Sequence, residues 1–361
     1  MSQFKKTLIL VLTFTSLSSL ALAQTVVGTI PVGAHPQAIA ANPITNRIYT
    51  ADEPASQLTE IDGASGATTS IPLGPTSEQS LAAAIAVNPI TNKIYVVNVV
   101  DNNVVIVDGA TRAVSFVSVG LHPTAVAVNP LANKIYAVNS DDGTVSVIDG
   151  VSNTVKTVTV GASPLGIAID LSANKIFVSN SNSNTVTVIN GNTLKTSTVA
   201  VGNYPDRIAV NSLTHKVYVA NLLSNNVTVI NSSNDKATAS IPTGIYPVDL
   251  CINEITNKIY VLGLVTTDVT VISGGTNATT SVPVGANPEA IGVDEIRNAI
   301  YVANDGDNSV SVIRGSTNAV TTVPTPGLSP SGLAVNLLSN QVYFSNISQD
   351  NVTVLNGVPL P

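Results

Sequence analysis

Few side chains in this sequence of 361 residues have the types and spacing that chemistry needs. The chain has three histidines and one cysteine, and no G-x-S-x-G, H-E-x-x-H or cysteine-nucleophile pattern occurs. The remaining candidates lie in or next to a recurring G-x-x-P segment whose pre-proline residue varies from copy to copy. We hypothesise that a small ligand or peptide binds where these segments meet. The candidate ligand-binding residues are His35, Glu78, His122, Tyr204, Asp206, Arg207, Tyr246 and Glu289.

Two of these candidates stand out because tyrosine is otherwise a repeated residue in this chain. Seven of the nine tyrosines recur at one position of the repeat described below, whereas Tyr204 and Tyr246 both precede the proline of a G-x-x-P segment. Glu78 belongs to an insertion, Pro75 to Ser80, in an equivalent segment. Insertions on one face of a repeat protein often mark its binding face, so both features indicate the same side of the molecule.

A metal-dependent lactonase or lyase is the enzymatic alternative. It would use carboxylates of these segments with His35 or His122 around a divalent ion. The segment Asn304 to Asn308 contains Asp-Gly-Asp, but a calcium site needs six or more oxygen ligands. We therefore assign no catalytic residue, no metal ligand and no cofactor, and we favour a non-catalytic function.

The sequence contains an internal repeat, and this repeat predicts the secondary-structure elements that carry the candidate residues. The stretch N-P-I-T-N-K-I-Y-V-V-N at 88–98 returns in eight related copies with a period of about 41 residues. The aromatic residue of the copies is Tyr49, Tyr95, Tyr136, Phe177, Tyr218, Tyr260, Tyr301 and Tyr343. Each copy contains runs of about six Val, Ile, Thr and Tyr residues separated by Asn, Gly and Pro, which predicts four short β-strands per repeat.

Four strands per repeat of this length are typical of a β-propeller blade, so we predict an all-β, eight-bladed propeller. The units lie near 36–74, 82–120, 123–161, 164–202, 205–244, 247–285, 288–327 and 330–357. The last unit lacks its fourth strand, and 25–33 resembles a fourth strand with nothing before it. We therefore expect strand 25–33 to complete the last blade and close the ring. Seven blades with a loose repeat is the alternative.

The repeated segment itself is interpreted as scaffold. Asn88 can cap its own turn, Pro89 fixes φ, and Asn92 suits a left-handed backbone position. Ile94 to Val97 form a strand that neighbouring blades cover on both faces, so Tyr95 and its equivalents should pack between blades rather than form a ligand platform.

The copies I-Y-V-V-N, I-Y-A-V-N, I-F-V-S-N, V-Y-V-A-N and I-Y-V-A-N, each followed by a V-x-V-I-[DN]-G-like strand, resemble the YVTN-type β-propeller repeat. The resemblance extends over the chain after residue 23. It implies a propeller fold and a place among exported bacterial or surface-layer proteins. It supplies no catalytic motif, and its familiar members are described as seven-bladed.

The chain begins with features of a secretory signal peptide. Lys5 and Lys6 precede a mostly apolar run, and Ala21-Leu22-Ala23 fits a cleavage site, so we assign 1–23 to the signal peptide and 24–361 to the propeller. We expect a periplasmic or extracellular protein with no membrane span. Cys251 is the only cysteine, which excludes an internal disulfide, and a formal net charge of −7 makes nucleic acid an unfavourable partner. We expect a monomer.

Charged residues divide between the two faces that a propeller would have. Lysines and arginines follow the turns between first and second strands or lie near those between third and fourth strands, whereas loops between second and third strands carry Asp52, Asp101, Asp141, Asp142 and other acids. The sequence thus predicts one basic and one acidic face. Partners from three function classes remain open: a ligand or peptide for a binding module, which we favour, a substrate for a metal-dependent enzyme, and a cell-surface polymer or second copy for a surface-layer component.

Overall fold

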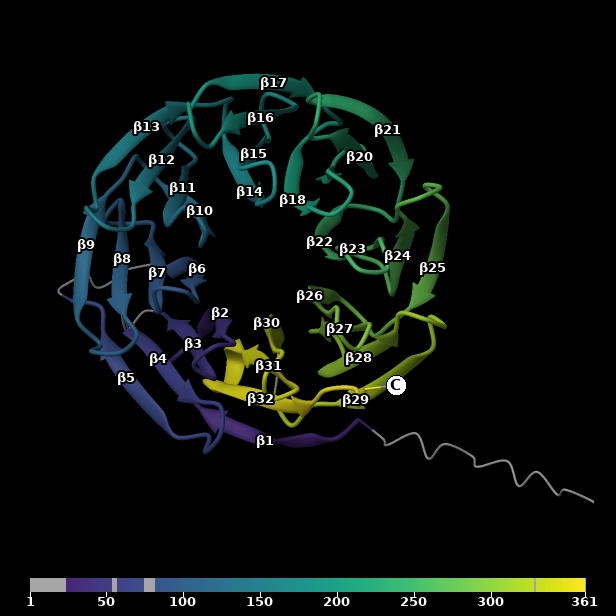
Figure 1. The fold of residues 1–361 in the computed structure, drawn as a ribbon. Coiled ribbons are helices and arrows are strands. Elements are labelled where there is room, and N and C mark those ends of the chain that lie inside the picture. The colour runs from purple at the N-terminus through teal and green to yellow at the C-terminus, as the bar shows by residue number, and fades with distance from the viewer. Residues whose placement is uncertain (1–23, 54–56, 75–81, 328, 361) are drawn as a thin grey trace, which may run out of the picture.

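The computed structural model describes residues 24–53, 57–74, 82–327 and 329–360. In this part of the chain, 32 strands form eight four-stranded antiparallel sheets that stand as blades around a central axis (Figure 1). The strands of a blade are called A to D from the axis outward. The predicted eight-bladed propeller is confirmed, and the seven-bladed alternative is excluded.

Blades 1 to 4 use strands in simple chain order. Their bounds are β2 (Pro36–Asn42), β3 (Arg47–Asp52), β4 (Gln57–Asp62) and β5 (Thr68–Pro72) in blade 1; β6 (Ala82–Asn88), β7 (Lys93–Asn98), β8 (Asn103–Asp108) and β9 (Val114–Ser118) in blade 2; β10 (Pro123–Asn129), β11 (Lys134–Asn139), β12 (Thr144–Asp149) and β13 (Val155–Thr159) in blade 3; β14 (Pro164–Asp170), β15 (Lys175–Asn180), β16 (Thr185–Asn190) and β17 (Thr196–Ala200) in blade 4.

Blades 5 to 7 follow the same order, and blade 8 takes its outer strand from the start of the chain. Their bounds are β18 (Pro205–Asn211), β19 (Lys216–Asn221), β20 (Asn226–Asn231) and β21 (Lys236–Pro242) in blade 5; β22 (Pro247–Asn253), β23 (Lys258–Gly263), β24 (Asp268–Ser273) and β25 (Thr279–Pro283) in blade 6; β26 (Pro288–Asp294), β27 (Ala299–Asn304), β28 (Ser309–Arg314) and β29 (Val320–Pro324) in blade 7; β30 (Pro330–Asn336), β31 (Gln341–Asn346), β32 (Asn351–Asn356) and β1 (Val26–Pro31) in blade 8, with a short 3₁₀ turn, η1 (Ile347–Gln349).

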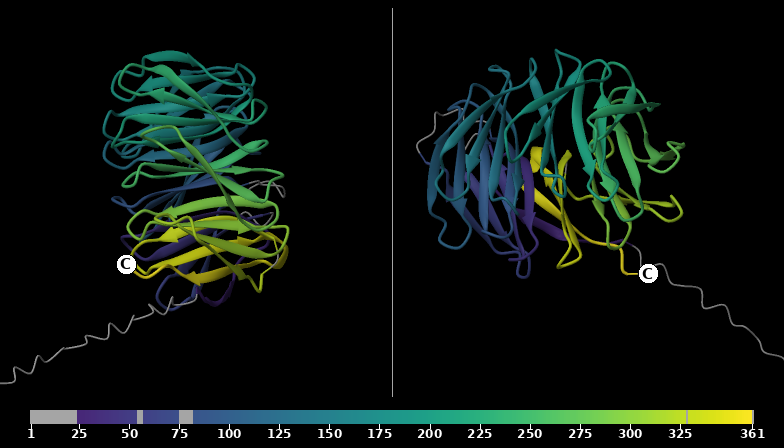
Figure 2. Two further views of the ribbon diagram at one scale, coloured as in Figure 1. Left: turned by 90° about the vertical axis from the view of Figure 1, so that its right-hand side faces the viewer. Right: turned by 45° about the horizontal axis from the view of Figure 1, so that its top comes forward.

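The ring closes through blade 8, as predicted. Strand β1 pairs antiparallel with β32, in a register that sets Thr29 opposite Thr353. The first and the last strand of the chain therefore lie side by side in one blade (Figures 1 and 2). Beyond β32, Val358 is buried, and its amide N–H donates to the hydroxyl of Tyr301 in blade 7 at 3.0 Å. Pairing the ends removes two free strand edges at the point where the ring would otherwise open.

The hydrophobic core is divided into clusters that lie between neighbouring blades. Tyr49 of blade 1, for example, packs in one cluster with Ile94 and Val96 of blade 2. The aromatic residues of the B strands are at most 1% exposed. The expectation that they pack between blades, and do not form a ligand platform, is confirmed.

The turns between strands A and B join each blade to the next. The Oδ1 atom of Asn129 accepts the N–H groups of Leu131 at 3.1 Å and Ala132 at 3.0 Å, which is the predicted turn cap. Its Nδ2 atom donates to Oδ1 of Asn174 in blade 4 at 2.9 Å. Asn174 has φ of 48°, the left-handed conformation expected for its type. Equivalent inter-blade bonds join Asn42 to Asn92, Asn88 to Asn133, Asn211 to Asn257, Asn253 to Asn298 and Asn336 to Asn46.

The basic residues that follow these turns are engaged within the protein. The Nζ atoms of Lys93, Lys216 and Lys258 donate to main-chain carbonyls of Gly150, Gly274 and Gly315 in the next blade. Other members pair with acids, as Lys134 does with Asp149 at 2.6 Å and Lys175 with Asp235 at 2.7 Å. The acids that receive them lie on the same face, so the predicted basic face contains many internally neutralised charges.

The tip of each A–B turn exposes an aliphatic side chain. At seven turns this residue lies two positions after the capping Asn or Asp and is between 57% and 74% exposed; these residues, which we call the aliphatic ring, are Ile44, Ile90, Leu131, Leu213, Ile255, Ile296 and Leu338. In blade 4 the exposed aliphatic residue is Leu171, at 38%, one position earlier. All eight turns lie in described segments of the chain and have equal length between strands.

Candidate functional site

The pre-proline residues lie in the D–A loops, on the face opposite the A–B turns. Their backbone is held in the left-handed region, with φ of 52° at both Tyr204 and Tyr246. The N–H of Tyr246 donates to Oδ1 of Asn225 at 2.9 Å, and that of Tyr204 donates to Asn184 at 2.9 Å. Each tyrosine is therefore anchored by its main chain to the B–C loop of the preceding blade, which leaves its side chain free to vary.

The two tyrosines belong to one continuous strip of loops across blades 5 and 6. The carbonyl of Tyr204 accepts the N–H of Leu222 at 2.9 Å, and the carbonyl of Tyr246 accepts the N–H of Leu264 at 2.9 Å. Because Asn225 of the blade 5 B–C loop also holds Tyr246, the D–A and B–C loops of these two blades are bonded in series. The sequence hypothesis that both tyrosines serve one site fits this arrangement.

Exposed apolar side chains gather on the same strip. They form what we call the blade 5/6 patch, with exposed fractions between 40% and 64%: Leu223, Ile245, Tyr246, Leu264 and Val265. The B–C loops of blades 5 and 6 read L-L-S-N and L-V-T-T. Blade 2 has V-V-D-N, with Val100 exposed, whereas blades 3, 4 and 7 have S-D-D-G, S-N-S-N and D-G-D-N. Sequence reasoning missed these loops, although their apolar composition was a usable signal.

Three charged residues lie on the inner strands just below this patch. Arg207 on β18 is exposed and makes no hydrogen bond or ion pair within the described residues. Asp249 on β22 accepts the N–H of Ile291 in blade 7 at 3.2 Å. Burial raises the pKa of Asp249 to about 6, although the positive charge of Arg207 lowers it in part. Burial raises the pKa of Asp206 in the same way. An unpaired guanidinium thus lies near two carboxyl groups that bind protons more readily than usual.

The other candidate residues are not brought into this cluster. His35 and His122 belong to blades 1 and 3, away from blades 5 and 6, and the imidazole of His122 lies 3.9 Å from Asp141. Glu289 is exposed on β26 of blade 7, outside the two blades that carry the patch. Glu78 and its insertion lie outside the described residues. The single pocket at the channel mouth stays a prediction; the described members of its candidate set lie on blades 1, 3, 5, 6 and 7. The core of the candidate site is Tyr204, Tyr246, Asp206 and Arg207.

Within the described segments, no group of three or more His, Cys, Asp and Glu could hold a metal ion. In the Asp-Gly-Asp segment, Asp307 accepts the N–H of Ala286 at 3.1 Å and the hydroxyl of Ser309 at 2.6 Å. Its carboxylate therefore fixes a D–A loop, as Asp142 and Asp350 do for Leu121 and His35.

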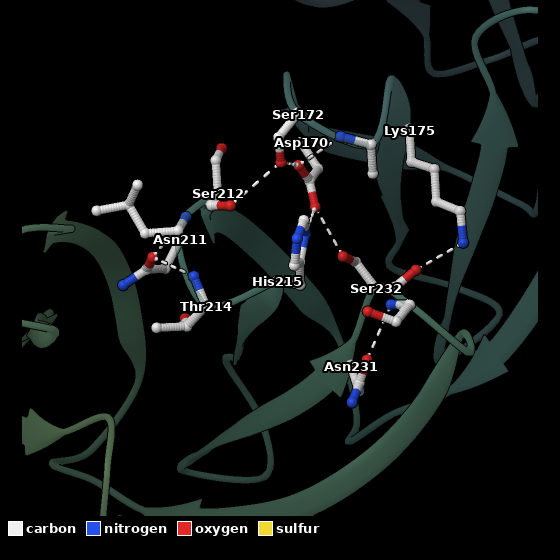
Figure 3. A network of polar contacts seen from close by, with 12 residues as sticks. Asp170, Ser172, Lys175, Asn211, Ser212, Thr214, His215, Asn231 and Ser232 are labelled. Carbon is white, nitrogen blue, oxygen red and sulfur yellow. Dashed lines mark hydrogen bonds and ion pairs between the residues drawn. The ribbon is translucent and has the colours of Figure 1, made fainter.

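One cluster has the residue types of a serine hydrolase site but not the geometry. Asp170 is 0% exposed, and its Oδ2 receives both Nδ1 of His215 at 3.0 Å and Oγ of Ser232 at 2.7 Å (Figure 3). A nucleophilic serine must hydrogen-bond the imidazole, whereas Ser232 is buried and bonds the carboxylate. Burial would raise the pKa of Asp170, but hydrogen bonds from Ser172, Ser232 and His215 hold it below its ordinary value. The pair occupies the place of an inter-blade Asn–Asn bond.

The acidic residues of the opposite face also need one correction. Asp52 was assigned to an acidic B–C loop, but its side chain is 0% exposed and accepts the hydroxyls of Thr50 at 2.7 Å and Thr59 at 2.5 Å. It takes the place of a buried asparagine at the end of strand B in other blades, such as Asn139. Burial raises the pKa of Asp52 to about 6.

The fold defines the chain as an eight-bladed β-propeller of four-stranded blades. No protein-family model matches it, and no curated protein matches it in sequence. Among solved structures, hydrazine synthase from Kuenenia stuttgartiensis is similar, with a TM-score of 0.62 and 20% identity over 77% of this chain and 96% of that chain. Virginiamycin B lyase from Staphylococcus aureus has a TM-score of 0.61 and 14% identity over 75% of this chain and 93% of that one. A streptogramin B lyase has a TM-score of 0.62 and 13% identity over 91% and 96%.

Because the sequence identities are low, these structures show a similarity of fold alone. They include enzymes, so the propeller fold alone does not separate binding from catalysis. In the described part of the chain, no helix has the length and apolar character to cross a membrane.

Proposed function

We propose that this chain is an exported, non-catalytic binding module that acts in the periplasm or outside the cell. Its ligand, a small molecule or peptide, would lie on the blade 5/6 patch with a polar group directed to Arg207 and Asp249. The observation that carries the proposal is the concentration of exposed apolar residues in the D–A and B–C loops of these two blades. Apolar side chains on bonded loops, next to an unpaired charge, are the usual composition of a recognition surface.

The chemistry of the site favours an amphipathic ligand. Leu223, Ile245 and Val265 would cover an apolar or aromatic body, with Tyr204 and Tyr246 at its edges. Arg207 would bind a carboxylate or another acceptor, because it is the free cation of the cluster. Partial protonation of Asp249 near neutral pH would let this carboxyl donate a hydrogen bond to the same group.

Native mass spectrometry of the protein purified from its own host tests this proposal. We expect a bound mass on the wild-type protein that is lost or reduced at least about tenfold in Tyr204→Asn/Tyr246→Asn. Asparagine is compatible with the backbone there, because Asn287 occupies the equivalent position of blade 7 with φ of 47°. The matched control is Ser163→Asn/Ser329→Asn, the same loop position in blades 4 and 8. Equal ligand occupancy in the tyrosine variant and the wild type would reject the site.

A metal-dependent lyase is the second candidate, because two of the similar structures are named virginiamycin B lyase and streptogramin B lyase. The assay is incubation with virginiamycin B, with and without added divalent metal, followed by mass analysis of the antibiotic. Metal-dependent conversion that chelator abolishes would favour the enzyme over the binding module. Unchanged antibiotic would remove this substrate from consideration.

A further inference from the structure

The joint between blade 8 and blade 1, where the ring closes, contains a pocket of about 230 Å³. Residues 27–30 of β1 line it from blade 8, and residues 62–66 of the C–D turn line it from blade 1. Gln341 and Tyr343 of β31 and Val354 of β32 complete the lining. In Figure 1 this joint lies where β1 and β32 meet blade 1. The pocket shares no residue with the blade 5/6 patch, so it is a separate candidate for binding.

An equivalent groove at the joint between blades 3 and 4 carries longer or charged side chains. It is lined by residues of strand B, strand D and the next C–D turn that include Lys134, Lys156 and Leu194. At the same three positions, the joint between blades 8 and 1 has Gln341, Gly28 and Gly66. Both lysines and the leucine are thus absent from the pocket at the ring closure, which makes this pocket less charged and leaves its centre unfilled.

Gly66 stands where the C–D turns of other blades have a side chain that reaches the preceding blade. In blade 2 this residue is Arg112, whose guanidinium donates to a carboxylate of blade 1 at 3.0 Å. In blade 5 it is Asp235, which pairs with Lys175 of blade 4 at 2.7 Å. A Cβ atom at Gly66 would lie 3.5 Å from Cδ1 of Ile30, so a side chain here would also approach β1. Its absence leaves that space open.

The exposure of Ile30 shows that no other part of the described chain fills the space. Ile30 is only partly buried, whereas the residue at its position in the other seven D strands is between 2% and 8% exposed. On the same strand, a Cβ atom at Gly28 would meet no atom within 4 Å. Apolar surface that is buried in every other blade is therefore accessible at this joint, as expected for a binding pocket.

The lining chemistry favours an uncharged ligand with one hydrogen-bonding group. Asp62 is the only charged residue of the lining, and its carboxylate is occupied by Arg47 and by two main-chain N–H groups of its own turn, both at 2.9 Å. Gln341 accepts the O–H of Tyr343 at 2.8 Å, and its Nε2 group makes no hydrogen bond within the described residues. That amide can donate to an oxygen atom of a ligand.

The size of the pocket narrows the ligand further. A cavity of about 150 Å³ can hold a benzene molecule, so a pocket of about 230 Å³ has room for one ring and a small substituent. We propose that the pocket between blades 8 and 1 binds a small uncharged ring compound with a hydroxyl group, such as a phenol. The ring would cover Ile30 and Tyr343, and the hydroxyl oxygen would accept the N–H of Gln341. Because the ligand would contact β1 and blade 1 together, it would also stabilise the closed ring.

Fluorine NMR and thermal unfolding with 4-fluorophenol test the proposal. We expect the wild-type chain after residue 23 to broaden the fluorine signal of this probe and to melt at a higher temperature in its presence. The variant Gly66→Leu fills the pocket, so its affinity for the probe should be at least about tenfold weaker. The matched control is Asn277→Leu, which places the same residue at the same turn position of blade 6, where φ is 61°. This control carries similar backbone strain and should bind the probe like the wild type.

A second filling variant, Gly28→Thr, avoids that strain. Thr280 occupies the equivalent position of β25, so Gly28→Thr should fold normally and lose affinity as Gly66→Leu does. The charged probes 4-fluorobenzoate and 4-fluorobenzylamine should bind the wild type at least about tenfold more weakly than 4-fluorophenol. Absence of 4-fluorophenol binding in the millimolar range would overturn the proposal, as would equal affinity in the wild type and both filled variants. Tighter binding of either charged probe would contradict the uncharged class of ligand.

Discussion

Individual residues in this propeller are best understood by comparing the eight copies at one position. Asp52 is the clearest case, because asparagine stands at the equivalent place in most blades, for example at Asn139 and Asn180. The Nδ2 atom of Asn139 donates to Thr144 at 2.9 Å and Ser146 at 3.0 Å, whereas Asp52 accepts hydroxyls and must bury a charge. The cost of that charge appears as its raised pKa of about 6.

The substitution Asp52→Asn should therefore stabilise the protein at pH 7. The pKa is raised above the unfolded value of about 3.9, so the native state binds more protons between these two values, and stability falls as pH rises through this window. We expect the Asp52→Asn variant to have a free energy of unfolding about 1–3 kcal/mol higher at pH 7, with a flatter pH dependence between about pH 4 and 6. Urea unfolding at several pH values measures both; a less stable variant at pH 7 would contradict the account.

The sequence predicted the contacts of some of these residues but not those of others. Capping asparagines such as Asn129 were predicted because a turn cap is a local feature of the chain. Their bonds to the next blade were not, because the distance from Asn129 to Asn174 depends on how the blades pack. The sequence places Asp52 among the loop acids because it follows a strand, whereas its burial depends on how the loops pack around that strand end.

At the level of elements, the A–B turns act as inter-blade joints as well as connections. Each capping asparagine holds its own turn and one in the next blade, and the following lysine reaches a carbonyl or acid, often in the next blade. This explains why the turn sequence recurs more faithfully than the B–C and D–A loops. On the other face, B–C loop asparagines such as Asn225 also bond the next blade, but they bond the main chain of the pre-proline residue, so the side chain of that residue is free to vary.

Removing one joint should cost measurable stability. In Asn129→Ala the turn loses its cap, and Asn174 loses an inter-blade donor, so we expect a loss of about 1–3 kcal/mol in the free energy of unfolding. Leu131→Ala in the same turn serves as the control and should change stability little at low protein concentration, because its side chain is exposed. Equal stability of both variants in chemical denaturation would show that the inter-blade bond contributes nothing.

The whole molecule is held closed by β1, which the sequence predicted from an unmatched strand at each end. Counting the repeats gave the number of blades. Closure followed because an unpaired strand leaves main-chain hydrogen-bonding groups without partners, so the extra first strand and the incomplete last blade were expected to pair. The blade 5/6 patch could be predicted only in part, through Tyr204 and Tyr246. The other candidates, His35 and His122, share their loop position, but ring geometry separates them from that patch.

Closure can be tested by removing residues 24–33. The edge of β32 would be exposed, and we expect the shortened chain to aggregate or to melt at a clearly lower temperature than the chain that keeps these residues. A synthetic peptide with the sequence of 24–33 should restore the melting temperature by adding the missing strand, and a scrambled peptide should not. An unchanged melting temperature after deletion would mean that β1 does not close the ring.

The central functional claim is that the ligand lies on the blade 5/6 patch. Hydrogen exchange followed by mass spectrometry, on protein with and without its co-purified ligand, tests this most directly. We predict slower exchange on ligand binding in the loops around 203–207, 222–225, 243–249 and 264–267, with little change in the A–B turns. Slower exchange confined to other blades, or at the A–B turns, would contradict the assignment.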